Sequence, residues 1–387
     1  METRAVGPLA GYRVLEIEAI GPGPFAAMLL GDLGADVLRI DRPPSAQSPL
    51  GPLPGNPLER GRHCLVIDLK DGRDRATVMR LVQSADVLIE GFRPGVAERL
   101  GIGPDDCLAV NPRLVYGRMT GWGQDGPLSN AAGHDLNYIA LSGMLHAIGR
   151  AGGPPVPPLN LLGDFGGGGL LLAFGVVAAL LERQASGCGQ VIDAAMAEGA
   201  ALLGAAIYGA YANGSWSEER GTNVGDTGSH FYETYETADG KWISVAAVEP
   251  QFYVELSARI GLDPTLMPPQ MDRAGWPEAK RIMADVFRSK TRDEWCQLLE
   301  GTDACFAPVL SMREAPIHPQ NQARRAFVAV GEVLQPAPAP RFSRTPLADP
   351  RPAAPASEYS DANLRAWGLE CAEIARLAKS DPDGREP

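Results

Sequence analysis

Short apolar runs alternate with segments of helical patterning over the first 120 residues of the chain. Parallel strands need a crossover of a dozen or more residues, and strands covered by helices on both faces have almost continuously apolar sequences. The alternation therefore predicts βαβ units around a buried parallel sheet, which is an α/β, Rossmann-like domain. The strands are expected at 13–17, 35–41, 64–69, 86–90 and 114–119, with helices that include 24–33 and 72–84.

The remainder predicts a helical middle and then a smaller α+β domain. Long helices rich in Gly and Ala, which indicate a tightly packed or intertwined core, are expected at 135–148, 167–183 and 194–213. The Asp239-Gly240 pair between two alternating runs is a strong hairpin signal. That hairpin is expected from strands 231–237 and 241–248, followed by helices at 250–260, 277–289 and from Thr291, where Glu294 has capping-box spacing.

These patterns divide the chain into a large and a small domain. The large Rossmann-like domain is expected over 1–195 and 325–387, a linker helix over 196–222, and the small domain over 223–324. The Pro-rich stretch 336–355 is expected to be extended, with one last helix at about 362–377.

Charge and composition exclude several classes of function. The formal net charge of −12, from 35 basic and 47 acidic residues, argues against nucleic acid or an anionic membrane as the main partner. The most apolar run, 169–181, is too short to span a bilayer and is expected to be a buried helix. Six cysteines without C-x-x-C spacing, five scattered histidines and no secretory leader indicate a cytoplasmic protein with reduced thiols and no metal.

The first βα turn contains the pattern Gly21-x-Gly23-x-x-Ala26, with Asp41 twenty residues after Gly21. This pattern is typical of dinucleotide-binding folds, so an NAD-dependent oxidoreductase is one hypothesis. However, Pro22 and Pro24 remove backbone N–H donors that a phosphate would use. A structural turn, or a wall of another ligand's site, remains open.

Three further residues are candidates for acid/base chemistry. His134 precedes a predicted helix and is either a hydrogen-bonded structural residue or a catalyst. Asp164 is followed by four glycines, Gly166 to Gly169, and is either a helix cap or a residue that a ligand or another backbone approaches closely. Glu249 ends a predicted strand and could be a surface charge.

Six long segments of the chain carry a family resemblance: VLEIEAIGPGPFAAMLLGDLGADVLRIDRP (14–43), DVLIEGFRPGVAERLG (86–101), RMTGWGQDGPLSNAAGHDLNYIALSG (118–143), PPLNLLGDFGGG (157–168), GCGQVIDAAM (187–196) and YETADGKWISVAAVEPQFY (235–253). With these segments the chain resembles the α-methylacyl-CoA racemases, a branch of the class III CoA-transferase family. The departures from the family pattern are an insert near Pro49 to Leu58 and the tail after about Trp367.

The resemblance implies an interlocked homodimer that binds coenzyme A, with no nicotinamide at the glycine turn. The active site would form between the large domain of one chain and the small domain of the other. Coenzyme A would be part of the substrate, so no separate cofactor is implied. The residues expected to contact it are Arg42, Ile67, Asp68, Leu69, Lys70, Gly91, Phe92, Arg93, Pro94, Gly95, Arg99, Gly133, Asp135, Leu136, Asn137 and Tyr138.

The resemblance also implies roles for the three acid/base candidates. His134, supported by Glu249, would act on one face of C2 of a 2-methylacyl thioester, and Asp164 on the other. Racemisation needs two such groups because a proton removed from one face must return to the opposite face. The alternative is a class III CoA transferase that uses Asp164 as nucleophile and needs no second base. A third, non-enzymatic alternative is a CoA-binding regulatory dimer, which would require a site without this acid/base set.

Overall fold

The computed structural model describes residues 6–43, 56–355 and 360–378. Its packing divides the chain into two compact units. The first comprises Met1–Ser142, Leu159–Leu203 and Arg325–Pro387, and the second comprises Gly143–Pro158 and Gly204–Arg324. This division differs from the predicted limits, because 143–158 groups with the second unit and the expected linker helix is split at residue 203.

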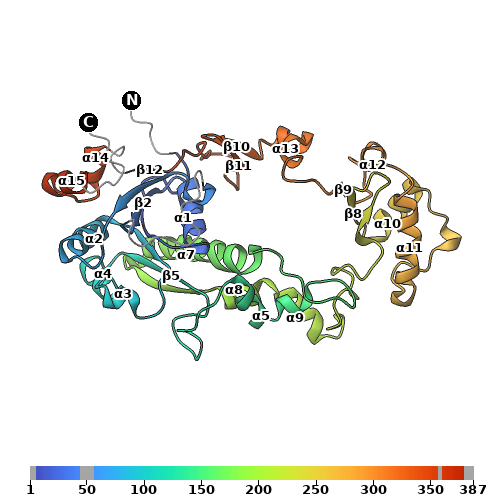
Figure 1. Cartoon of the computed structure of the whole chain (residues 1–387), viewed down its shortest axis with the longest axis horizontal. Helices are drawn as coiled ribbons and strands as arrows, with labels where there is room; N and C mark the ends of the chain where they lie inside the picture. Colours follow the sequence, from blue (N-terminus) through green and yellow to red (C-terminus); the bar gives the residue numbers. More distant parts are fainter. Residues whose placement is uncertain (1–5, 44–55, 356–359, 379–387) are drawn as a thin grey trace. The chain divides into compact units, whose positions relative to one another are not determined.

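The first unit is built on a seven-stranded parallel sheet with the spatial order β12-β3-β2-β1-β4-β5-β6 (Figure 1). The order reverses between β1 and β4, which lie side by side although β2 and β3 separate them in sequence. The α/β prediction is thereby confirmed. The strands are β1 (Arg13–Ile17), β2 (Asp36–Asp41), β3 (Arg62–Val66), β4 (Val87–Glu90), β5 (Val115–Thr120), β6 (Gln190–Ala195) and β12 (Ala354–Pro355).

Helices cover both faces of this sheet, because successive side chains of each strand point to opposite sides. Leu15, Leu38 and Leu88 pack with α2, α4 and the C-terminal helices, whereas Val14 and Val37 pack with α1 and α7. Figure 1 shows these helices around the sheet. The helices of this unit are α1 (Pro22–Asp32), α2 (Gly72–Ser84), α3 (Val96–Arg99), α4 (Pro104–Val110), α5 (Asp135–Leu141), η2 (Leu161–Leu170), α7 (Leu171–Ser186), α8 (Met196–Leu203), α14 (Asp361–Ala366) and α15 (Cys371–Ala378), with a short 3₁₀ turn η1 (Pro57–Glu59).

The middle of the chain differs from the prediction in its element boundaries. Strand β6 was not expected, and the helix predicted from residue 194 instead begins at Met196, after this strand. The helix predicted over 135–148 ends at Leu141 and restarts as α6 (Met144–Ala147), because Gly143 between them adopts φ +76°. A small antiparallel pair, β10 (Phe327–Val330) and β11 (Val333–Pro336), was also not expected.

The element η2 is a π-helix that continues directly into α7. Together they form a helix of 26 residues, Leu161–Ser186, longer than the predicted apolar run and apolar enough to cross a membrane by length and composition. Core helices of soluble proteins meet the same criterion, and here η2 and α7 pack against α1, β5 and β6. The prediction that the apolar segment is too short to span a bilayer was therefore wrong. The predicted burial of this helix holds for its face toward the sheet.

Glycines in η2 allow other backbones to approach it. A Cβ on Gly167 would lie 2.5 Å from the backbone N of Ala200, and one on Gly199 of α8 would lie 1.9 Å from the carbonyl oxygen of Gly167. Both distances are impossible for real side chains, so η2 and α8 pack backbone to backbone. Of the two explanations for the glycines after Asp164, the close approach of another backbone is confirmed.

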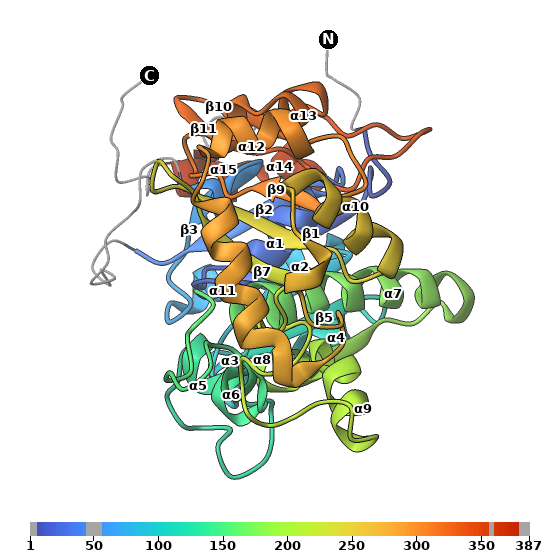
Figure 2. The ribbon, with the colours of Figure 1, turned by 90° about the vertical axis from the view of Figure 1, so that its right-hand side faces the viewer.

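The second unit contains a three-stranded antiparallel sheet in the order β7-β8-β9, covered by helices (Figure 2). Its core joins Ile243 of β8, Phe287 of α11 and Trp295 of α12. The elements are α6, α9 (Ala205–Ala212), β7 (Tyr232–Glu236), β8 (Trp242–Ala246), α10 (Pro250–Ile260), η3 (Pro264–Leu266), η4 (Arg273–Gly275), α11 (Trp276–Phe287), α12 (Arg292–Leu299), β9 (Phe306–Pro308), η5 (Ala315–Ile317) and α13 (Pro319–Ala323).

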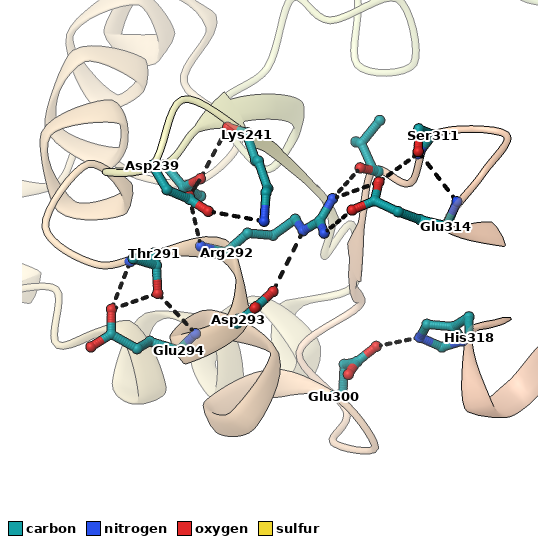
Figure 3. A network of polar contacts seen from close by, with 12 residues as sticks. Asp239, Lys241, Thr291, Arg292, Asp293, Glu294, Glu300, Ser311, Glu314 and His318 are labelled. Carbon is teal, nitrogen blue, oxygen red and sulfur yellow. Dashed lines mark hydrogen bonds and ion pairs between the residues drawn. The ribbon is translucent and has the colours of Figure 1, made fainter.

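A polar network holds α12 to its neighbours in this unit (Figure 3). Arg292 donates through Nη2 to Glu314 at 2.6 Å and through Nη1 to the Val309 carbonyl at 3.1 Å. The predicted capping box is confirmed, since the Thr291 amide donates to Glu294 at 2.8 Å and the Glu294 amide donates to the Thr291 hydroxyl at 3.3 Å.

The C-terminal tail is an integral part of the first unit. Trp367 is fully buried, and its indole N–H donates to Asp36 at 2.9 Å. The single helix predicted over 362–377 is two helices, α14 and α15, because Gly368 between them adopts φ +90°. Residues 49–55 of the insert lie outside the described residues.

Candidate functional site

A cavity of about 810 Å³ opens in the first unit at the carboxyl ends of its strands. Residues that directly follow β1, β4 and β5 line it, and so does Met196, which directly follows β6. Ligands of open α/β sheets bind at this edge, where the strand order reverses. The volume lies within the range of small-molecule and cofactor sites.

His134 lies on the wall of this cavity, immediately before α5. Its backbone N–H donates to the Asn137 side chain at 3.1 Å, and its carbonyl accepts from the Asn137 N–H at 2.8 Å. The Tyr138 hydroxyl donates to the Gly133 carbonyl just before it. The backbone of His134 is therefore fixed while its side chain is exposed, which suits a group that must reach a ligand.

Asp164 lines the same cavity from the first turn of η2 and is not a cap. Partial burial raises the pKa of its carboxyl; the amide of Asn160, which donates to Oδ2 at 3.1 Å, lowers it, and the Asp135 carboxylate raises it again. A carboxyl with a raised pKa is better suited to accept and return a proton near neutral pH.

The glycine turn between β1 and α1 forms part of the wall beside Asp164. Gly21 has φ +74°, and a Cβ on it would lie 3.2 Å from Oδ2 of Asp164. Asp41, which would contact a ribose in a dinucleotide site, pairs with Arg39 at 2.6 Å and does not line the cavity. These contacts favour the third interpretation of the turn, a wall of another ligand's site.

The residues expected to contact coenzyme A fall into two groups. Arg42, Gly91, Phe92, Arg93, Pro94, Gly133, Asn137 and Tyr138 line the cavity. The others do not line it: Ile67, Asp68, Leu69, Lys70, Gly95, Arg99, Asp135 and Leu136. Ile67 and Leu69 are buried in the core of the unit, and Asp135 is buried beneath η2.

The basic residues of the N-terminal third do not form one phosphate-binding set. Arg39 pairs with Asp41, Arg60 with Asp32 at 2.5 Å, and Arg62 with Glu16 at 2.5 Å. The positive charges that face the cavity come from two other arginines, Arg42 and Arg93, and both are exposed. Arg39, Arg60 and Arg62 are therefore engaged by carboxylates of the protein itself.

Several cavity residues were not singled out from the sequence. They include Glu18, Ser129 and Met196. Asn160, which does not line the cavity but donates to Asp164, was not singled out either. A usable signal for Glu18 was its place directly after β1, because loops at the carboxyl ends of parallel strands form ligand sites. Asn160 stands four residues before Asp164, a spacing at which helical side chains meet.

Glu249 belongs to the second unit, where it immediately precedes α10 and is exposed. Within the described residues, 6–43, 56–355 and 360–378, no cluster of three or more His, Cys, Asp or Glu side chains is arranged to hold a metal ion.

The chain is 47% identical over 371 residues to the α-methylacyl-CoA racemase of Mus musculus (95% of this chain, 96% of the relative) and 45% identical to that of Homo sapiens, with the same coverage. A solved CAIB/BAIF family protein from Brucella suis is 25% identical, with a TM-score of 0.78 over 93% of this chain and 99% of that one. A family model described as CoA-transferase family III matches residues 9–359, and the chain belongs to this family.

Proposed function

We propose that this enzyme is an isomerase that interconverts the 2R and 2S epimers of 2-methylacyl-CoA thioesters. The observation that carries the proposal is that His134 and Asp164, two groups able to exchange protons, line one cavity. The identity of 45–47% to racemases supports this function over the CoA-transferase alternative.

In the proposed reaction, one of the two groups removes the proton from C2 and the other supplies a proton to the opposite face. The negative charge of the intermediate is delocalised onto the thioester oxygen as an enolate. Positioned acid/base catalysis contributes about 10²–10⁴-fold, so stabilisation of the enolate must supply much of the rest. The chemistry requires no metal, flavin or nicotinamide.

Coenzyme A would enter from the side of the cavity that carries Arg42 and Arg93. These side chains are exposed, and Arg42 pairs with Glu18 at 3.2 Å. Arginine suits phosphate because its planar guanidinium donates two parallel hydrogen bonds. The branched acyl group forms the opposite end of the substrate, and its C2 would lie between His134 and Asp164.

A single epimer of a 2-methylacyl-CoA in D₂O, followed at C2 by NMR with no second acid present, tests the proposal. A racemase introduces deuterium at C2 and destroys stereochemical purity. If C2 does not exchange and coenzyme A instead moves to an added carboxylic acid, the enzyme is a transferase. Titration with NADH and with acetyl-CoA, followed by calorimetry, tests the oxidoreductase alternative in the same preparation.

We further propose that the active enzyme is a homodimer in which Glu249 of one chain supports His134 of the other. An apolar stripe in the first unit supports association: Leu170, Phe174, Val177 and Leu181 are 38–73% exposed. Their spacing places them on one face of the helix formed by η2 and α7. A soluble protein rarely leaves such a face in water.

Co-expression of His134→Ala and Glu249→Ala chains tests the arrangement. If Glu249 acts across the dimer, each mixed dimer contains one site with both residues intact, so inversion returns to about half the wild-type rate per mixed dimer. If Glu249 acts within its own chain, every site lacks one residue and no activity returns.

A further inference from the structure

Asp135 is a buried carboxylate that contacts the backbone carrying Asp164. It is 6% exposed. Its Oδ2 accepts hydrogen bonds from the N–H groups of Gly163 at 2.7 Å and of Asp164 at 2.8 Å. Its Oδ1 is buried and has no hydrogen-bond partner within the described part of the chain. The hydrogen bonds that Asp135 accepts there come from backbone N–H groups and not from a cationic side chain.

The local backbone is shaped around this contact. A Cβ on Gly163 would lie 2.5 Å from Oδ2 of Asp135, so only glycine leaves room for the carboxylate. The first N–H groups of a helix have no acceptor within the helix, and Asp135 is the acceptor for two of them at the start of η2. Because Asp135 also directly follows His134 in sequence, it links the backbones of both proposed acid/base residues.

We propose that Asp135 is a positioning residue for Asp164: it fixes the peptide from which the Asp164 side chain projects and places a negative charge beside that carboxyl. The inference rests on the proposed function of Asp164. It differs from the expectation that Asp135 contacts coenzyme A, because Asp135 does not line the cavity. Misplacement of a reacting group by about 1 Å can cost about 10²-fold in rate, so such a residue matters without touching the substrate.

The charged groups around Asp164 are few. Asp135 raises the pKa of Asp164 and His134 lowers it, after the larger effect of burial. Tyr138 of α5 lines the same cavity. Burial raises the pKa of its hydroxyl, and the Asp164 charge raises it further. Of the helices packed on η2, α1 has Asp32 only at its far end, paired with Arg60, and the one acidic residue of α8, Glu198, is exposed.

The ionisable groups on the other elements packed against η2 have partners of their own. On α7, Arg183 pairs with Asp86 at 2.7 Å, and on β5 Arg118 pairs with Glu90 at 3.0 Å. On β6, Asp193 accepts from the Gln124 N–H at 3.0 Å. Asp135 is therefore the negative charge whose removal should most affect Asp164.

Two substitutions separate position from charge. Asp135→Asn keeps an oxygen that can accept from both N–H groups but removes the charge, whereas Asp135→Ala removes both. Asp71→Asn is the matched control, because Asp71 also accepts two backbone N–H groups through one oxygen, from Arg73 at 2.7 Å and Asp74 at 3.3 Å, at the start of α2. Circular dichroism and thermal melts establish that each variant is folded.

The expected result is a loss in kcat with an unchanged KM for the CoA ester, about 10-fold for Asp135→Asn and about 100-fold for Asp135→Ala. In the direction in which Asp164 takes the proton, the acid limb of the rate profile moves to lower pH in Asp135→Asn, because a neighbouring negative charge has been removed. Asp71→Asn should match wild type in both. A raised KM with unchanged kcat would overturn the proposal and make Asp135 a binding residue.

A measurement without substrate keeps the inference separate from the proposed function. The Asp164 carboxyl is titrated by NMR in protein carrying ¹³C-labelled aspartate, with its signal assigned by its absence in Asp164→Asn. Its pKa should fall in Asp135→Asn, because a neighbouring negative charge has been removed, and stay unchanged in Asp71→Asn. An unchanged pKa in Asp135→Asn overturns the proposed effect of the Asp135 charge on Asp164, even if wild type racemises its substrate. If wild type fails to exchange C2, the proposed function fails while this titration still decides the inference.

Discussion

Asp164 in the first unit and Glu314 in the second are carboxylates with opposite environments. Asp164 receives one side-chain hydrogen bond, from Asn160, and burial raises its pKa. Glu314 receives two hydrogen bonds from Arg292, at 2.6 and 3.3 Å, and one from the Ser311 N–H at 2.9 Å (Figure 3). These bonds lower the pKa of Glu314 to about 2.

The difference separates a carboxylate suited to chemistry from one suited to holding a fold. Hydrogen bonds to the charged form stabilise it, so Glu314 stays ionised and holds α12 to the chain that follows β9. Asp164 lacks such support and is held next to another carboxylate, which is costly in a folded protein. Groups that are strained electrostatically in this way concentrate at functional sites.

The largest expected effect comes from substitutions of the two proposed acid/base residues, Asp164 and His134. Asp164→Asn and His134→Ala should each abolish inversion at C2, with a loss of about 10³-fold or more, because no second group remains to protonate the opposite face. Each variant should retain at most exchange of one epimer with retention of configuration. Deuterium incorporation at C2 from both epimers, followed by NMR in D₂O, measures this.

Glu314→Gln is the control for these variants, since it removes a carboxylate of the second unit that has no place in the proposed chemistry. It should invert its substrate at the wild-type rate at neutral pH. Inversion that persists in either Asp164→Asn or His134→Ala would contradict the two-base scheme.

A smaller effect concerns the packing that carries Asp164. Gly199→Ala places a Cβ against the Gly167 carbonyl, at a distance of 1.9 Å before relaxation. Because both atoms belong to packed backbones, we expect a loss of about 3 kcal/mol in the free energy of unfolding. Inversion should fall as well, since η2 has to shift. Denaturant unfolding followed by circular dichroism measures the stability.

The matched control is Gly209→Ala in α9, where a Cβ would have no atom within 4 Å. There the substitution should stabilise the protein by about 0.5–1 kcal/mol, since alanine favours the helix over glycine. Equal stabilities of the two variants would mean that η2 and α8 are not packed as closely as described.

The two sides of the comparison also differ in how far the sequence predicts them. Strand β1 and helix α10 have the predicted bounds, because each has a strong local signal: a continuous apolar run in one and a proline at the start of the other. The capping box of α12 was predictable for the same reason. Strand β6 was missed because its residues Gln190, Val191 and Asp193 are exposed and lack an apolar run.

At the site, His134 and Asp164 were recognised from local motifs and from the resemblance, and they lie on one cavity. Asp135 was predicted as a ligand contact, and its side chain is buried beneath η2, where it accepts from the Gly163 N–H. This three-dimensional contact joins α5 to η2, two elements that are separated by some twenty residues in sequence. No local pattern could have predicted the π-helix, since its glycines are required by the close approach of the α8 backbone, which is distant in sequence.

The smallest expected effect is the pH dependence of the stability that Glu314 contributes to the second unit. The pKa of Glu314 is lowered in the folded protein, to about 2 from 4.5, so its contribution to stability is fully present above pH 4.5. It is lost as the pH falls toward 2 and the carboxylate takes up a proton. Glu314→Gln should therefore lower the melting temperature slightly at pH 6 and not at all near pH 2.

Glu255→Gln, which removes one partner of an exposed pair with Arg259, is the control in the same unit, and it should change the melting temperature at pH 6 by less. A Glu314→Gln difference from wild type that stays constant between pH 6 and pH 2 would mean that the network of Arg292 holds α12 by its shape and not by its charge.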